Sequence, residues 1–476
     1  MTPATRRIAV VLAVGAAAAL TACSSPLSSG PPPPTTAAPT TTTIEGASTP
    51  AQTKGSAYRA QLTYLMVEHV YLLSRVTQGI ASAGASSASG ATGTSGVSGT
   101  SGTSGPTGAS GTTGPSGVAA SAGAIAAVNA ATGTSGASGA TVGTLDDASA
   151  ALATNSADIA DWLSLAQGYG SSFDTAFLPL WQARNADFVD YATAKAAGDT
   201  DGVTSATDAL TSNATAIATL FHTTNEYIPI TTVTNPPTGL GDELGSDNSA
   251  VTAFIVDQAT AASTVATDTV TAAEDMYHTA DFLAAAAAKL DPDQYPGTVD
   301  GTAANLRSSV TMAWVEHVEL AALNIDQIEG GQKAGVWSAA LDNNTQQIEH
   351  VIASNLGDQA ARQFGALWTS YIGSLRTYAY AESVGDTTTA ASARGQLSGT
   401  AQAVGAFFAA QRIGLGADVI SADVEPIISG LQLVADAATS HAPEGTLIRT
   451  AAGYVPKFGS DVSEAFAIAN PTLFAP

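Results

Sequence analysis

An internal duplication constrains the fold of this chain more than any other feature of its sequence. Residues 62–72 read LTYLMVEHVYL and residues 310–320 read VTMAWVEHVEL, an ungapped match that also aligns Arg59 with Arg307. Further matched segments follow in the same order in both copies. Their aligned pairs are Leu152/Leu341, Asn155/Asn344, Ile159/Ile348, Phe177/Phe364, Trp181/Trp368, Tyr191/Tyr378, Leu210/Leu397, Ile217/Val404 and Phe221/Phe408. Such a repeat of ordered segments indicates two copies of one structural unit.

The matched segments have helical periodicity. In the first one, core-forming positions recur every three or four residues, at Leu62, Leu65, His69, Leu72 and Val76. Aromatic residues make up only 6% of a chain that is 45% hydrophobic, so alanine and other small residues supply much of the apolar surface and favour closely packed helices. We therefore predict an all-α fold.

Glycine–aspartate pairs at 198–199 and 385–386 predict the end of one helix and the acidic start of the next. Four helices with short connections specify an antiparallel, up-and-down bundle in each copy. Residues 249–290 contain no proline or glycine and predict one additional long helix, with a shorter counterpart at about 419–438 and a further segment near 447–468. The expected architecture is two tandem four-helix-type bundles, each with an extra C-terminal helix or helix pair.

The N-terminus predicts an export signal over residues 1–23. Arg6 and Arg7 precede an apolar run from Ile8 to Leu20, which is shorter than the ~20 residues that a membrane-spanning helix needs. The segment 20–23, Leu-Thr-Ala-Cys, resembles the lipobox of bacterial lipoproteins. That resemblance implies that Cys23 becomes the acylated N-terminus, anchored in the cell membrane on its extracytoplasmic face.

Two low-complexity tracts divide the rest of the chain. Residues 24–55 are rich in Pro, Thr and Ser and predict a disordered tether. Residues 84–143 form a Gly/Ser/Thr insertion that the second copy lacks, and glycine recurs at every third position from Gly90 to Gly117. A collagen-like stalk needs this spacing together with abundant proline, so a flexible loop is the favoured interpretation. The predicted bundles then span 56–296 and 297–476.

Charge and cysteine content exclude several classes of function. The formal net charge is −24 with only 16 Lys and Arg residues, which argues against nucleic acid or anionic lipid as a partner. The single cysteine excludes a disulfide framework and a Cys-based zinc site.

His69 and His317 are the strongest candidates for a binding site, because each lies within the apolar face of its helix beside Glu68 or Glu316. One interpretation makes each histidine a metal or small-ligand contact, with Asn155 and Asn344 as neighbours. The favoured alternative makes it a core histidine bonded to one of these asparagines or to a tyrosine hydroxyl, because a buried imidazole needs a partner and one histidine per copy is too few for a standard metal site. We expect the adjacent glutamates to face solvent.

A weaker metal candidate lies on the predicted long helix, where Glu274, Asp275 and Asp281 fall within one turn of His278. An exposed polar helix face explains the same residues and is the favoured interpretation. A ferritin-type di-iron site needs Glu-x-x-His on two helices, and the sequence has no such motif.

The chain resembles an uncharacterised helical-bundle family of Gram-positive bacteria, whose members are sometimes duplicated and sometimes exported. The resemblance rests on three helices in order: one with Glu-His-Val, one with Asn-x-x-x-Ile, and an aromatic one that ends in Gly-Asp. The resemblance covers most of residues 56–296 and 303–476. It implies a fold and no defined activity. Members of the family often carry a histidine in the third helix, where this chain has Trp181 and Trp368.

We expect a lipid-anchored, non-enzymatic binding or interaction module of the cell envelope, with a protein or glycan partner and no cofactor. The alternative is a metal or small-ligand carrier that uses the buried histidine of each bundle.

Overall fold

The computed structural model describes residues 50–90, 139–167, 171–229, 239–295, 299–332 and 335–474. All regular elements of these residues are helical, which confirms the predicted all-α class. The predicted signal peptide, Cys23 and most of the tether lie outside the described residues. So does the middle of the glycine-rich insertion, whose two ends belong to the helices that flank it.

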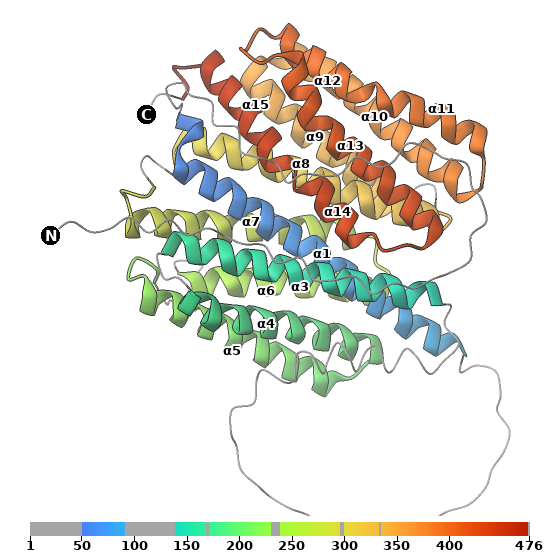
Figure 1. Cartoon of the computed structure of the whole chain (residues 1–476). Helices are drawn as coiled ribbons and strands as arrows, with labels where there is room; N and C mark the ends of the chain where they lie inside the picture. The colour runs from blue at the N-terminus through green and yellow to red at the C-terminus, as the bar shows by residue number, and fades with distance from the viewer. Residues whose placement is uncertain are drawn as a thin grey trace, which may run out of the picture. The chain divides into compact units, whose positions relative to one another are not determined.

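The first copy is built around its first helix. Its elements are η1 (Pro50–Gln52), α1 (Lys54–Gly90), α3 (Gly139–Gln167), α4 (Ser171–Ala197), α5 (Thr200–Thr224), α6 (Leu240–Thr260) and α7 (Val265–Leu290). Helix α1 packs against α3, α4, α6 and α7, while α5 packs against α4 and α6 (Figure 1).

The second copy repeats this arrangement around α8. Its elements are α8 (Thr302–Glu329), α9 (Val336–Leu356), α10 (Asp358–Ser383), α11 (Thr387–Ser398), α12 (Thr400–Ala410), α13 (Ala417–Ser440), α14 (Gly445–Ala452) and α15 (Val455–Ala469). Helix α8 packs against α9, α10, α13 and α15, as α1 does against α3, α4, α6 and α7.

The expected helix ends are confirmed at both glycine–aspartate pairs. Gly198 and Gly385 adopt left-handed backbone conformations, with φ of 69° and 71°. Asp199 then caps α5 by accepting hydrogen bonds from the backbone N–H groups of Asp201 and Gly202, and Asp386 caps α11 by accepting one from Thr389.

The prediction of one long helix over residues 249–290 is wrong. The chain turns at Ala261, whose φ of 51° is left-handed, and α6 and α7 pack side by side. Both helices bury apolar side chains against α1, such as Phe254 and Met276, and a single straight helix could not bring both faces to the same core. The fourth helix of the second copy also differs from expectation, because it divides at Gly399 into α11 and α12.

The two arginines that the repeat aligns have different partners. Arg59 of α1 pairs with Asp281 of α7. Arg307 of α8 donates to the Ala51 carbonyl at 3.0 Å, and burial lowers its pKa to about 10, opposed by the negative charges of Asp461 and Glu464 on α15.

The two copies share one core. Residues Ser48–Pro476 form one compact unit, in which α1 packs lengthwise against α8. A single continuous cluster of buried hydrophobic side chains runs from Tyr58 in the first copy to Phe466 in the second. The helix that carries His69 is thus in direct contact with the helix that carries His317.

Candidate functional site

His69 lies on α1 with its ring fully buried. Its Nδ1 is 2.8 Å from Oδ1 of Asn155 on α3, and its Nε2 is 3.0 Å from the side-chain amide of Asn185 on α4. The ring also packs on Trp181, with 5.1 Å between ring centroids. Two neighbouring helices, α3 and α4, therefore hold the imidazole in place, and both of its nitrogens have partners.

Burial keeps this imidazole neutral. Desolvation lowers the pKa of His69 to about 4, opposed by its bond to Asn155. A neutral ring that donates from Nδ1 to Asn155 accepts at Nε2. In the structure Nε2 faces Oδ1 of Asn185, whose side-chain nitrogen donates to the Ser156 hydroxyl at 3.0 Å. Asparagine side chains therefore cover both ring nitrogens, and a metal could reach neither without displacing one of them.

His317 on α8 is buried in the same way but has looser partners. Trp368 donates from its indole nitrogen to Nδ1 over 3.4 Å, and the Tyr371 hydroxyl lies 3.5 Å from Nε2. Desolvation lowers the pKa of His317 to about 3, opposed by Asn344. The position matched to Asn185 is Ile372, so the second copy replaces an amide partner with the neighbouring tyrosine.

The prediction that Glu68 and Glu316 face solvent is wrong. Both are buried where α1 meets α8, a surface that a single bundle would expose. Glu68 accepts hydrogen bonds from the Tyr64 hydroxyl and the Asn155 amide, each at 2.8 Å, and pairs with Arg449 at 3.2 Å. Arg449 belongs to α14 of the second copy, so the first copy is completed by a cation from the second.

Two buried glutamates of α8 have fewer hydrogen-bond partners than Glu68 has. Glu316 receives one hydrogen bond, from Asn344 at 3.3 Å, and Glu319 receives none at either carboxylate oxygen within the described residues. Burial raises the pKa of each to about 8. Both side chains are therefore protonated at neutral pH.

These groups belong to a buried polar layer between the copies, which we call the charge seam. Its members are Glu68, Arg75, Glu316, Glu319, Asp326, Glu444 and Arg449. Arg75 of α1 donates to Asp326 of α8 at 2.6 Å, and burial, together with the negative charge of Asp326, raises the pKa of Glu444. Every link of this layer joins residues far apart in the sequence.

A second buried charge pair lies inside the first copy and was not predicted. Arg184 of α4 donates to Asn248 at 2.8 Å and lies 3.8 Å from Asp247 of α6, with its guanidinium over the rings of Trp181 and Phe188. Burial lowers the pKa of Arg184 to about 10 and raises that of Asp247 to about 7. The sequence signal for Arg184 was a charged residue within the apolar face of its helix.

The weak metal candidates Glu274, His278 and Asp281 are not arranged as a metal site, and Glu274 is exposed on α7. Asp281 is engaged by Arg59, and His278 is exposed on α7. Within the ranges that the structure describes, no group of three or more His, Cys, Asp or Glu side chains is arranged to hold a metal ion.

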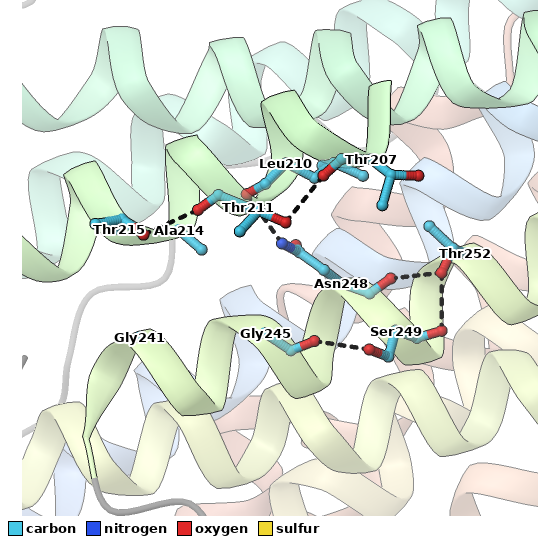
Figure 2. A pocket seen from close by; sticks show the side chains of 10 residues that line it. All are labelled: Thr207, Leu210, Thr211, Ala214, Thr215, Gly241, Gly245, Asn248, Ser249 and Thr252. Atoms are coloured by element: carbon cyan, nitrogen blue, oxygen red, sulfur yellow. Dashed lines mark hydrogen bonds between the residues drawn. The ribbon is translucent and has the colours of Figure 1, made fainter. Parts of the chain in front are cut away.

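A groove lies between α5 and α6 of the first copy (Figure 2). Threonines line it from α5, while Gly241, Gly245 and Ser249 line it from α6. In this groove the Asn248 side chain donates to the Leu210 carbonyl at 3.1 Å and accepts a hydrogen bond from Arg184. Both polar groups of the Asn248 amide are therefore already used.

Comparison with known proteins finds no family model, no curated protein and no solved structure that matches this chain. Within the described residues, no helix combines the length and the apolar character that crossing a bilayer requires.

Proposed function

We propose that this chain is a lipid-anchored protein of the extracytoplasmic membrane face that acts by binding a protein or glycan partner rather than by catalysis. The supporting observation is the joint core of the two copies. Because α1 and α8 pack against each other, α4–α5 and α10–α12 lie on the far sides of their own bundles (Figure 1). The matched outer helices, α4–α5 and α10–α12, therefore belong to one compact unit. This arrangement suits the binding of a partner that presents two equivalent surfaces.

The geometry of the histidines favours this proposal over the carrier alternative. The nitrogens of His69 are bonded to two asparagines, and those of His317 lie against Trp368 and Tyr371. Binding a metal would require breaking these contacts inside a packed core. The chain purified without chelator should hold no transition metal above background by elemental analysis. Near two equivalents per chain, lost in the His69→Ala/His317→Ala double variant, would favour a carrier.

Photo-crosslinking in cells tests the binding proposal. Thr211 on α5 and Ser398 on α11 are exposed and occupy matched positions of the repeat, one residue after Leu210 and Leu397. A photoreactive amino acid at either site of the anchored protein should yield the same crosslinked partner. The same group at exposed Lys289 on α7 is the control. Absence of crosslinks at both matched sites, or identical yields at Lys289, would contradict the proposal.

The anchor is tested separately. Cys23→Ala should move the protein from the membrane fraction to the medium or soluble fraction, and intact-mass measurement of the native protein should show an acylated N-terminal cysteine. An unmodified mature N-terminus would contradict the lipid-anchor part of the proposal while leaving the crosslinking result valid.

A further inference from the structure

The groove between α5 and α6 is lined by hydroxyl groups and carries no charge. Its five hydroxyl side chains are Thr207, Thr211 and Thr215 of α5 and Ser249 and Thr252 of α6. None of the ten residues that line it is acidic, basic or aromatic, although the whole chain has a net charge of −24 (Figure 2). A phosphate, a carboxylate or an ammonium group would therefore find no charged or aromatic partner in this groove.

The five hydroxyls present hydrogen-bond acceptors. Each of them donates to a backbone carbonyl four residues earlier in its own helix, at distances of 2.8 to 3.0 Å. A carbonyl oxygen only accepts, so the hydroxyl hydrogen is used in this bond and the hydroxyl oxygen keeps a lone pair for a ligand. The same bond orders the side chain before a ligand arrives, which lowers the entropy cost of binding. The groove therefore suits a ligand that supplies the donors.

Apolar groups lie between these acceptors. They are the methyl groups of the threonines together with Leu210 and Ala214. A sugar ring has the matching mixture, because its C–H groups and its O–H donors alternate around one small ring. The groove has a volume of about 170 Å³, below the ~300 Å³ of a typical small-molecule pocket, so it fits a short part of a ligand. The rest of a chain would lie along the exposed surface of α5.

We propose that this groove binds an uncharged carbohydrate chain, whose hydroxyls donate to the threonine and serine oxygens. The site belongs to the first copy alone, because the repeat matches Thr207 and Thr215 to Arg394 and Gln402. One site per chain is therefore expected. The inference rests on the extracytoplasmic location in the proposed function, which places the groove among the glycans of the cell envelope. It does not depend on a partner that contacts both copies.

Calorimetric titration tests the proposal on the whole protein, purified in a detergent without a sugar headgroup. The probes are neutral hexasaccharides of glucose, mannose, galactose and arabinose, with hexamers of glucosamine and galacturonic acid as the charged comparison. At least one neutral probe should bind with one site per chain, and more tightly than either charged probe. Failure of every neutral probe to bind, two sites per chain, or tighter binding of a charged probe would overturn the proposal.

A blocking substitution locates the site. A Cβ added at Gly245 meets no atom within 4 Å, so Gly245→Leu should fill the groove without disturbing the helix and should abolish saccharide binding. Gly373→Leu is the matched control, at an exposed and equally open position of α10, and should bind like the parent. Unchanged binding by Gly245→Leu would overturn the proposal.

Removal of hydroxyls tests the chemistry. Thr207→Val with Thr211→Val keeps the shape of the groove but removes two acceptors, and it should weaken binding by about tenfold or more. Thr204→Val with Thr219→Val is the control, because these exposed threonines of α5 make the same backbone bond outside the groove. Equal losses in the two pairs would overturn the proposal. Crosslinking at Thr211 and Ser398 tests the proposed function separately, so absence of saccharide binding beside a common crosslinked partner would reject the groove alone.

Discussion

Around His69, buried polar groups of the first copy form hydrogen bonds with one another. Asn155 is central among them, because its oxygen accepts from the imidazole while its nitrogen donates to the Leu65 carbonyl and to Glu68. One short side chain thus connects α3 to three groups of α1. Removing it leaves buried polar groups without partners, which costs more than the bonds themselves contribute.

Asn155→Ala should lower the free energy of unfolding by about 3 kcal/mol, because buried donors and acceptors lose their partners. Urea denaturation followed by circular dichroism measures this change. The neighbouring Thr154→Ala is the control, because Thr154 is exposed and bonds only its own helix, so its effect should stay within about 0.5 kcal/mol. Equal effects of the two substitutions would show that the hydrogen bonds of Asn155 do not stabilise the folded chain.

The buried histidines predict a defined pH dependence. The pKa of His69 is about 4 in the folded chain, below the ordinary value of 6.5. Its contribution to stability is therefore present above pH 6.5 and is lost as the pH falls toward about 4, since the unfolded state takes up the proton first. Imidazole nitrogen chemical shifts should show His69 neutral at about pH 5.5. A protonated ring at that pH would contradict the buried geometry.

At the scale of the helices, local signals and tertiary packing determine different boundaries. Gly198 and Asp199 end α4 and begin α5 by local chemistry alone, through a left-handed residue and a side-chain cap. The break between α6 and α7 has no such signal. Ala261 adopts the left-handed conformation because both helices bury their apolar faces on α1.

Asp199→Ala should destabilise the chain by about 1 kcal/mol, because two backbone N–H groups at the start of α5 lose their acceptor. Thermal unfolding measures the change. Asp199→Asn keeps an oxygen acceptor at the cap and should lie within a few tenths of a kcal/mol of the parent. A loss as large for asparagine as for alanine would assign the effect to charge instead of capping.

At the scale of the whole molecule, the two copies depend on each other. The charge seam and the shared hydrophobic cluster both cross the α1–α8 contact. Glu68 in the first copy has its cation in the second, and Asp326 in the second has its cation in the first. An isolated copy would expose apolar surface and leave these carboxylates without their partners.

Residues 48–296 and 297–476 produced separately should therefore aggregate or unfold without cooperativity, whereas their co-production should give a folded one-to-one complex. Size-exclusion chromatography with light scattering and thermal circular dichroism distinguish these outcomes. Two monomeric halves that each unfold cooperatively would show that the α1–α8 contact is dispensable, and they would restore the picture of independent tandem bundles.

Sequence by itself determined the helical class, the duplication and the capped ends of α4 and α10, because each depends on local periodicity, local backbone preference or the repeat. It left His69 open as a ligand contact or as a core residue bonded to an asparagine or a tyrosine hydroxyl. The partners Asn185 and Arg449 and the burial of Glu68, Glu316 and Glu319 were decided only by the tertiary structure. Arg449 lies 381 residues from Glu68 in the chain, and no local pattern links them. A carboxylate beside an apolar helix face looks solvent-exposed until a second helix covers it, and here that helix comes from the other copy.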